Sequence, residues 1–97
     1  MQNSIKTAKI FNALCDKTRV DIINLLTVSE KCACKISEEL NIAQSKLAYH
    51  MKILCESGLI ESSYIGKWTY YKINKDGFEI AINILKEIRN DTKDISN

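Results

Sequence analysis

The sequence predicts a mainly α-helical fold with a small β-hairpin, in the order of four helices, two strands and a fifth helix. Two observations lead to this prediction. Apolar residues recur with a helical period up to Gly58 and again from Phe78, whereas between these points the period is two. In addition, only Asn41-Ile42 separates the third and fourth helical segments, which is the short connection of a helix-turn-helix. A helix-turn-helix followed by a hairpin, or wing, is a winged helix-turn-helix.

The first three helices are short and joined by polar residues. Residues 4–14 form the first helix, whose apolar stripe is too wide for a helix with one buried side. Asp16 is the expected N-cap of the second helix, at about residues 17–27. A polar connection over residues 29–34 then leads to a third helix that ends at Leu40.

The fourth helix lies within residues 41–58, and its two sides differ. At ~100° per residue, one side carries the apolar residues Leu47, Met51 and Leu54, and the other carries Ser45, Tyr49 and Lys52. Gly58 is expected to end the helix in a left-handed conformation, with Leu59 folding back as the hydrophobic contact of that cap. Hydroxyls and a cation suit a groove lined by base edges and phosphates, so we interpret this segment as a DNA recognition helix.

The wing is predicted from residues 60–65 and 68–73, which are rich in β-branched and aromatic side chains and are joined at Gly66-Lys67. A hairpin alone is only marginally stable, so one face must pack on the helices, and we expect Tyr71 and Ile73 on that face. Lys67 lies at the tip, where a cation can reach a phosphate.

We expect a single domain over residues 1–97 that dimerises through its first and last helices. The last helix, at about residues 78–89 after a turn at 74–77, is apolar on most of its surface, as is the first. A domain this small cannot bury both faces of both helices, so residues 1–14 and 78–90 are predicted to form a twofold dimer interface. The alternative is that the excess apolar surface simply covers a thin core. The tail, residues 91–97, is polar and expected to fray.

Composition favours a cytoplasmic protein that can meet nucleic acid through the middle of its chain. The 97 residues are 45% hydrophobic, and the net charge is only +2. Between residues 44 and 75, however, five lysines face only two acids, Glu56 and Glu61. No export signal or apolar run of membrane length is visible, so we expect no membrane partner and reduced thiols at the four cysteines.

The predicted partner is double-stranded DNA, contacted by the polar face of the fourth helix and the tip of the wing. The candidate contacts are Gln44, Ser45, Lys46, Tyr49, His50, Lys52 and Lys67. His50 lies about 60° from the apolar stripe, so a structural hydrogen bond explains it at least as well as a base contact. For Arg19 and Asp21 the sequence does not separate a structural ion pair from a phosphate contact.

Several motifs, occurring in order between about Phe11 and Asn74, resemble the ArsR/SmtB family of metal-responsive repressors. They are Asp16-Lys17-Thr18-Arg19, Cys32-Ala33-Cys34, SKLAYHMKIL at residues 45–54, Glu56-Ser57-Gly58-Leu59-Ile60 and Gly66-Lys67-Trp68-Thr69-Tyr70-Tyr71. The Cys-Ala-Cys before the third helix is similar to the arsenic- and antimony-sensing branch. The resemblance implies a homodimeric repressor that binds an operator without any cofactor. It also implies release of that DNA when arsenite, antimonite or another soft metal ion binds.

The chemistry of Cys32 and Cys34 agrees with such an inducer, because soft metal ions and metalloids prefer thiolate sulfur. Both cysteines lie at a helix N-terminus and are flanked by Lys31 and Lys35, and both features are expected to lower the thiol pKa values. Within a regular helix the two side chains would point in nearly opposite directions, so they can bind one ion only if the chain is extended there. Ligation would then distort the third helix, which supports the recognition helix. The alternative is a pair of half-buried cysteines that bind nothing.

The source of a third thiolate is open. Some arsenic sensors of the family have a third cysteine one helical turn later, where this chain has Ser37. The candidates are Cys15, Cys55, a small cellular thiol, or no third ligand. Cys55 lies ~16 Å along its helix from Gln44, which makes it a poor partner for Cys34 within one protomer, and it is equally well explained as a core residue. Cys15 is slightly favoured, because it lies nearer the expected dimer interface. The family's alternative zinc site on the last helix is absent, because the only histidine is His50.

Two other functions are weaker alternatives. A repressor of the same fold could use its cysteines as a redox or persulfide switch, and would then respond to oxidant and not to arsenite. A small thiol oxidoreductase is disfavoured, because the chain has no CxxC and no signature of a polar pocket. We therefore predict no enzymatic activity.

Overall fold

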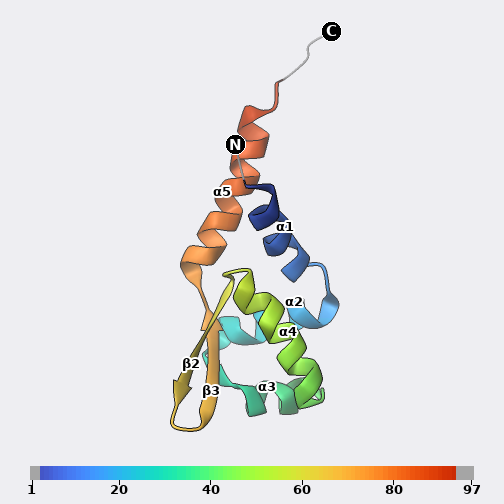
Figure 1. Ribbon diagram of the computed structural model, residues 1–97, viewed down its shortest axis with the longest axis vertical. Helices are drawn as coiled ribbons and strands as arrows, with labels where there is room; N and C mark the ends of the chain where they lie inside the picture. Colours follow the sequence, from blue (N-terminus) through green and yellow to red (C-terminus); the bar gives the residue numbers. More distant parts are fainter. Residues whose placement is uncertain (1–2, 94–97) are drawn as a thin grey trace.

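In the computed structural model, which describes residues 3–93, five helices and three short strands form an elongated molecule (Figure 1). The helices are α1 (Ser4–Ala13), α2 (Lys17–Val28), α3 (Ala33–Leu40), α4 (Gln44–Glu56) and α5 (Lys75–Asp91). The strands are β1 (Lys31–Cys32), β2 (Ile60–Ile65) and β3 (Trp68–Ile73). We call α2 through β3 the lobe, and α1 together with α5 the arm. Within the described residues, no helix is long and apolar enough to cross a lipid bilayer.

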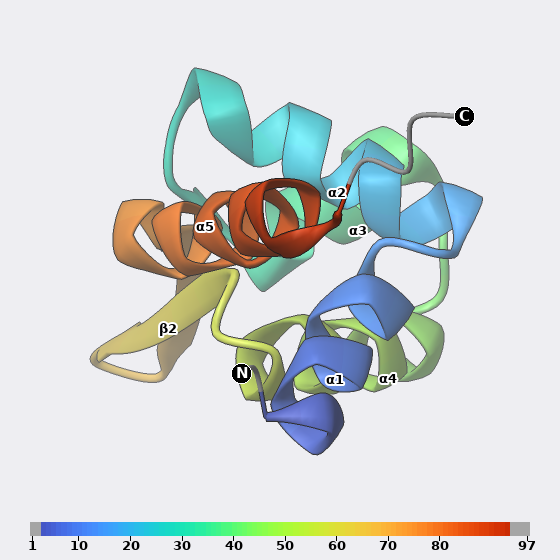
Figure 2. The same cartoon turned by 90° about the horizontal axis from the view of Figure 1, so that it is seen from above.

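The hydrophobic core fills the lobe and extends to the base of the arm. Its largest fully buried side chains are Ile10, Ile22, Ile36, Met51, Leu54, Leu59 and Ile60. Figure 2 looks down on the arm and shows α1 lying over α4, which is how Ile10 reaches this core. The apolar stripe predicted for the recognition helix is confirmed, because Leu47, Met51 and Leu54 are all buried.

The connection between α3 and α4 confirms the predicted helix-turn-helix. Asn41 ends α3 in the left-handed region, with φ 52° and ψ 51°, a conformation that asparagine adopts more readily than most residues. The Ser37 hydroxyl donates a hydrogen bond to the carbonyl of Ile42 and so closes the same turn. Gly58, with φ 83°, follows the end of α4, and Leu59 is fully buried behind it, as the predicted helix cap requires.

The sheet has three strands, in the order β1-β3-β2, where the sequence predicted only the two strands of the wing. The additional strand, β1, lies in the stretch predicted to be an irregular polar connection. It pairs antiparallel with β3, placing Lys31 opposite Tyr71 and Cys32 opposite Tyr70. A strand of two residues cannot show the alternation of apolar and polar side chains that marks a strand in the sequence. Its partner, β3, lies far along the chain, so the local sequence pattern could not reveal β1.

Helix α5 begins at Lys75, three residues before the predicted start. The side chain of Asn74 accepts a hydrogen bond from the backbone N–H of Gly77, so the residues predicted to form a turn are an N-cap and the first turn of the helix. Gly77 packs directly against the α4–β2 connection, because a Cβ atom placed on it would lie 1.9 Å from the carbonyl oxygen of Gly58. At its other end α5 reaches Asp91, which was predicted to belong to the frayed tail; residues 94–97 of that tail lie outside the described residues.

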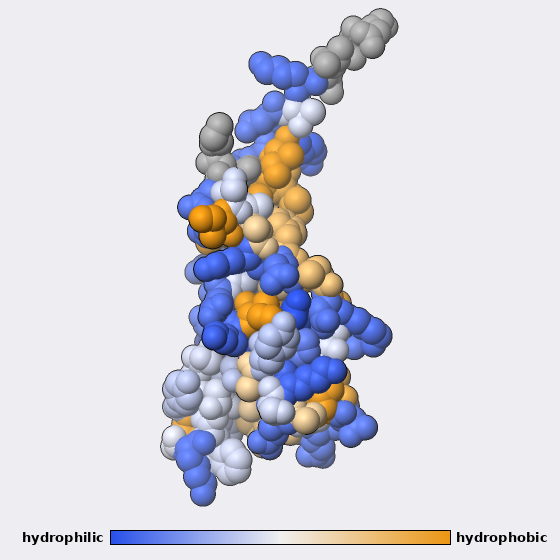
Figure 3. All heavy atoms as spheres, turned by 45° about the vertical axis from the view of Figure 1, so that its right-hand side comes forward, coloured by the Kyte–Doolittle hydropathy of each residue, from blue (hydrophilic) through white to orange (hydrophobic). Residues whose placement is uncertain are grey.

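Both helices of the arm expose apolar side chains to solvent. On α5, Ile80, Ile82, Leu85 and Ile88 are all exposed, and on α1 so is Ile5. Figure 3 shows apolar side chains along the elongated upper part of the molecule. This distribution matches the excess apolar surface expected for the two terminal helices.

Candidate nucleic-acid interface and cysteine pair

The outer face of α4 presents polar side chains to solvent, as the sequence predicted. Gln44, Ser45, Lys46, Tyr49 and Lys52 are all exposed, and 61% of Tyr49 is accessible. None of these five residues makes an ion pair with another residue in the described part of the chain, so both lysines are available to a phosphate. This face can therefore enter a groove without first breaking internal contacts.

The wing extends this polar surface and adds aromatic side chains. Lys67 is exposed in the turn between β2 and β3, and Tyr64 and Trp68 beside it are exposed to 76% and 51%. Lys72 contributes less positive charge, because its ammonium group lies 3.2 Å from the carboxylate of Glu61. The aromatic pair at the tip was not predicted as part of the interface, although its position beside Gly66-Lys67 in the sequence was a usable signal.

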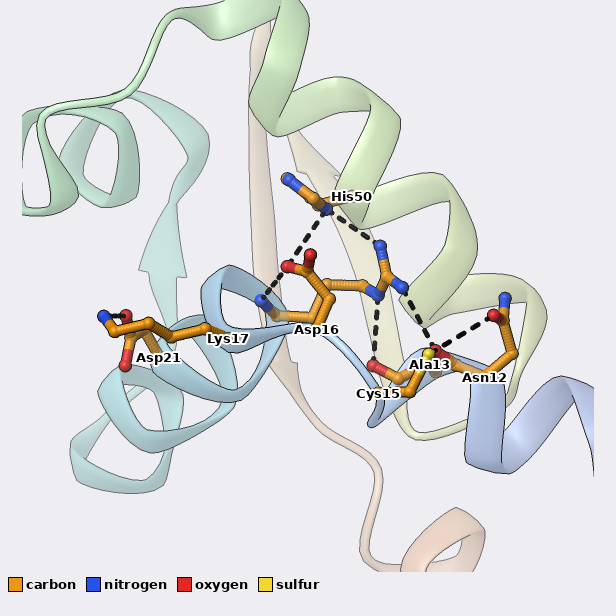
Figure 4. Close-up of polar contacts among 8 residues, drawn as sticks. Asn12, Ala13, Cys15, Asp16, Lys17, Asp21 and His50 are labelled. Atoms are coloured by element: carbon orange, nitrogen blue, oxygen red, sulfur yellow. Dashed lines mark hydrogen bonds and ion pairs between the residues drawn. The ribbon is translucent and has the colours of Figure 1, made fainter.

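His50 does not belong to the outer face of α4, although it was a candidate DNA contact. Only 4% of the residue is exposed, and its Nδ1 atom lies 3.1 Å from a guanidinium nitrogen of Arg19 (Figure 4). Since arginine can only donate, Nδ1 accepts and the imidazole is neutral. Its Nε2 atom is buried without a hydrogen-bond partner among the described residues. Of the two roles that the sequence left open for His50, a structural hydrogen bond or a base contact, the structure supports the hydrogen bond.

Arg19 is the centre of this buried contact, and it also joins three helices. Its Nε atom and one terminal nitrogen donate to the carbonyls of Ala13 and Asn12, each at 3.1 Å. These carbonyls belong to the last turn of α1, and that of Asn12 also accepts from the backbone N–H of Cys15. The guanidinium therefore helps to cap α1 while it binds His50 of α4. Asp21 does not pair with Arg19; its carboxylate lies 2.9 Å from Lys17 instead.

Electrostatics agree with a neutral His50. Burial lowers the pKa of its imidazole, and the nearby cations of Arg19 and Lys46 act in the same direction, whereas Asp16 opposes them. The carboxylate of Asp16 accepts a hydrogen bond from the backbone N–H of Arg19, as expected of the N-cap of α2, and this bond lowers its pKa.

Cys32 and Cys34 converge on each other where β1 meets α3. Cys32 has an extended backbone, with φ −74° and ψ 156°, and Cys34 lies in the first turn of the helix. Their sulfur atoms are 2.6 Å apart. The condition set by the sequence, an extended chain at the pair, is thus met without unwinding α3.

The two thiols are not equivalent, and the expectation that both would have lowered pKa values is wrong for one of them. The hydrogen bond from Cys34, together with the backbone N–H of Lys35, lowers the pKa of Cys32. The same hydrogen bond raises the pKa of Cys34, and burial adds to this effect. When one thiol of the pair loses its proton, the negative charge is therefore favoured on Cys32.

A cleft of about 320 Å³ is lined by residues of α3, α4 and the wing. Cys34 lies at one edge, Gln44 of the recognition helix at another, and Lys67 of the wing at a third. The remaining lining residues are Ala33, Leu47, Ala48, Trp68, Thr69 and Tyr71. The sequence could not reveal this cleft, because its walls come from segments far apart in the chain.

The other two cysteines lie elsewhere. Cys15 is exposed between α1 and α2, and its thiol contacts the side-chain oxygen of Asn12 at 3.6 Å (Figure 4). Cys55 is half-buried near the end of α4, and burial raises its pKa, which disfavours the thiolate. Within residues 3–93, no three side chains of histidine, cysteine, aspartate or glutamate come together as a metal site.

Comparison with known proteins identifies the family. Residues 16–62 match the bacterial regulatory protein, arsR family. An uncharacterized HTH-type transcriptional regulator of Methanocaldococcus jannaschii is 34% identical over 89 residues, which make up 91% of this chain and 100% of that protein. The chain belongs to the ArsR family. It is therefore a DNA-binding transcriptional regulator and not an enzyme.

Two further likenesses bear on how this ArsR-family protein works. The arsenical resistance operon repressor of Bacillus subtilis is 39% identical over 67 residues, covering 68% of this chain but only 64% of that repressor. A solution structure from Mycobacterium bovis, described as a homodimeric winged helix-turn-helix DNA-binding domain of a possible ArsR-family regulator, aligns with a TM-score of 0.72 at 19% identity. That alignment covers 95% of this chain and 88% of the other, and it confirms the winged helix-turn-helix fold.

Proposed function

We propose that this ArsR-family regulator is a homodimeric repressor, and that it leaves its operator when trivalent arsenic or antimony is bound by Cys32 and Cys34. The observation that carries the proposal is the convergence of these two sulfurs, 2.6 Å apart, at the start of α3. A soft, thiophilic centre can bind both without a large rearrangement of the chain. The similarity to an arsenical resistance operon repressor supports the choice of inducer.

The pair can act on DNA binding by two routes. The first runs through α3, whose last turn is tied to the short α3–α4 connection by the hydrogen bond from Ser37 to the carbonyl of Ile42. The second runs through β1, because Cys32 pairs with Tyr70 of the wing. Binding one atom between the two sulfurs moves them apart from their 2.6 Å contact. We expect this movement to shift the junction of β1 and α3, and with it the recognition helix and the wing.

The proposed DNA contacts are Gln44, Ser45, Lys46, Tyr49 and Lys52 on α4 and Lys67 on the wing, with His50 left out because it is buried. The proposed dimer interface is the apolar surface of the arm. Twofold pairing through α1 and α5 covers this surface and presents two recognition helices to one operator. The homodimeric neighbour from Mycobacterium bovis has the same fold and supports this arrangement.

The test is arsenite-induced release of operator DNA by reduced, purified protein. Cys32→Ser and Cys34→Ser variants should bind the operator with unchanged affinity and remain bound when arsenite is added. Cys15→Ser and Cys55→Ser are matched controls, because each removes a cysteine outside the pair, and they should release DNA as the parent does. A Cys32/Cys34 double variant that is still released at the parental arsenite concentration would place the sensor elsewhere.

A redox or persulfide switch is the second candidate. It is favoured by the same short sulfur–sulfur distance and by the lowered pKa of Cys32, which makes that residue the more reactive thiol. The two candidates are separated by adding hydrogen peroxide or an organic persulfide to metal-free protein on DNA. Release by these reagents together with no response to arsenite would replace the first proposal with this one.

A further inference from the structure

The cleft between α3, α4 and the wing has the composition of a site for a small anion with an apolar body. Among its described lining residues it has one cation, Lys67, and no carboxylate. The side chains of Gln44 and Thr69 add neutral hydrogen-bonding groups, while Ala33, Leu47 and Ala48 supply apolar wall. A volume of about 320 Å³ corresponds to roughly ten water molecules, enough for a compound the size of an amino acid.

One cysteine of the pair, Cys34, lines this cleft, and the pair does not complete a three-sulfur site within the described residues. Cys34 is one of the lining residues, and the sulfur of Cys32 is 2.6 Å from that of Cys34. Ser37, one turn further along α3, uses its hydroxyl in the α3–α4 turn. No third cysteine gathers with the pair within residues 3–93. A centre bound by the pair thus has one position left, and the cleft adjoins it.

We propose that this cleft binds a small thiol carrying a carboxylate, whose sulfur is the third ligand of the arsenic held by Cys32 and Cys34. The inference rests on the proposed function, because it assigns the remaining ligand at the same site. The carboxylate binds the ammonium group of Lys67, and the amide of Gln44 and the hydroxyl of Thr69 can hydrogen-bond to it. The carbon skeleton lies against the alanines and Leu47.

The chemistry is ligand exchange without any change of oxidation state. Arsenious acid, As(OH)₃, loses its three hydroxyl groups as water, each taking up the proton of one thiol. Three arsenic–sulfur bonds replace three arsenic–oxygen bonds, two to the protein and one to the small thiol. No oxidant or reductant is needed.

The position of the ligand also gives a direct reason for DNA release. Gln44 and Lys67 are both proposed DNA contacts, and both line the cleft. A carboxylate bound at Lys67 neutralises a charge that would otherwise meet a phosphate. The inducer complex and the operator then compete for the same wing cation, in addition to the shift of α3.

The experiment measures arsenite binding to the reduced full chain in the absence of DNA, because Lys67 is itself a proposed DNA contact. The reducing agent contains no thiol, and arsenite is added with one of three small thiols: 3-mercaptopropionate, 2-mercaptoethanol or cysteamine. Native mass spectrometry gives the composition of the adduct, and the arsenic–thiolate ultraviolet absorption gives its affinity. We expect one arsenic and one small thiol per chain, with mercaptopropionate favoured about three- to fivefold over mercaptoethanol and cysteamine weakest.

The variant Lys67→Gln tests whether the ammonium group of Lys67 recognises the carboxylate of the small thiol. It should remove the preference for mercaptopropionate while leaving the affinity measured with mercaptoethanol unchanged. Lys35→Gln is the matched control, because Lys35 adjoins the pair in sequence but does not line the cleft and lies 3.8 Å from Glu39. That variant should keep the preference.

Either of two kinds of result, one in the composition of the adduct and one in its affinities, would overturn this inference and leave the proposed function standing. One is an adduct of protein and arsenic alone that depends on Cys32 and Cys34. The other is equal affinity with all three thiols, or a preference that survives Lys67→Gln. By contrast, arsenic binding that persists in the Cys32/Cys34 double variant would overturn the proposed function itself.

Discussion

Helix α4 of the lobe and helix α5 of the arm bury their apolar residues to very different extents. In the lobe, Met51 and Leu54 of α4 are 2% and 0% exposed. In the arm, Leu85 and Ile88 of α5 are 55% and 49% exposed, and the buried residues of that helix are only Gly77, Ala81 and Ile84. Both helices carry apolar residues at helical spacing, but only the apolar stripe of α4 is covered by the elements packed around it.

From this difference we infer in which part of the molecule a substitution can be made without affecting dimer assembly. The lobe has a closed core, so a substitution on its outer face should alter DNA binding alone. The arm has an open apolar surface of the kind that marks an interaction site, so a substitution there should alter assembly first and DNA binding as a consequence. The following predictions test that division, beginning with the largest expected effect.

Charging the arm should separate the proposed dimer. In a Leu85→Glu/Ile88→Glu variant, two carboxylates would have to be buried in the interface of each protomer, so the dimer should weaken by at least about 100-fold. Light scattering at micromolar concentration should then show a monomer, and operator affinity should fall with it. Lys86→Glu, also exposed on α5, is the control and should remain a dimer. A dimeric double variant would remove the distinction between arm and lobe.

Removing the guanidinium that connects the two regions should destabilise the whole fold. Arg19→Met leaves the carbonyl of Ala13 and Nδ1 of His50 buried without this donor and removes one of the two donors to the carbonyl of Asn12, which should lower the free energy of unfolding by about 2–4 kcal/mol. Urea denaturation followed by circular dichroism measures this change. Lys17→Met removes a nearby but exposed cation and should have no measurable effect. Equal stability of the two variants would show that Arg19 does not hold arm and lobe together.

Changing the outer face of the lobe should weaken DNA binding while leaving assembly intact. Lys46→Ala and Tyr49→Ala should each reduce operator affinity about tenfold, and the lysine variant should also lower the slope of log affinity against log salt by about one. Fluorescence anisotropy across a salt series measures both quantities. The double variant should stay folded and dimeric. If it binds as tightly as the parent, α4 is not the recognition helix.

The smallest expected effect is the pH dependence contributed by His50. Burial lowers the pKa of this imidazole in the folded state, so the unfolded chain takes up the proton first as the pH falls through 6.5. Stability should therefore be complete above pH 7 and decrease toward pH 5.5, by at most about 1.4 kcal/mol. Urea denaturation at pH 7.5 and 5.5 measures the loss. His50→Gln should flatten the profile in this range, since the chain has no other histidine; an equally steep profile would assign the effect to another group.

The order of elements could be read from the sequence because it depends on local pattern. Leu47, Met51 and Leu54 recur at helical spacing, and Gly58 has the left-handed conformation expected after a helix. The same local signals placed Lys67 correctly in the turn of the wing.

The remaining features depend on contacts between distant segments. Strand β1 exists because Lys31 and Cys32 pair with β3, about forty residues away in the chain. His50 is turned inward by Arg19 of another helix, and the opposite pKa shifts of Cys32 and Cys34 come from a sulfur–sulfur contact made at the junction of β1 and α3. The cleft is likewise lined by three separate segments. The periodicity of a single segment therefore could not predict β1, the buried position of His50, the pKa shifts or the cleft.

The contact between Gly77 and the carbonyl of Gly58 sets the distance between the arm and helix α4. With no side chain at position 77, the first turn of α5 rests on the α4–β2 connection with nothing between them. The recognition helix ends at this same connection, so the glycine fixes how far the arm stands from α4. Any larger residue there acts as a wedge that pushes the arm away. In a dimer built through the arm, a wedge of this kind changes the separation of the two recognition helices, so this one glycine also limits which half-site spacings the protein can span.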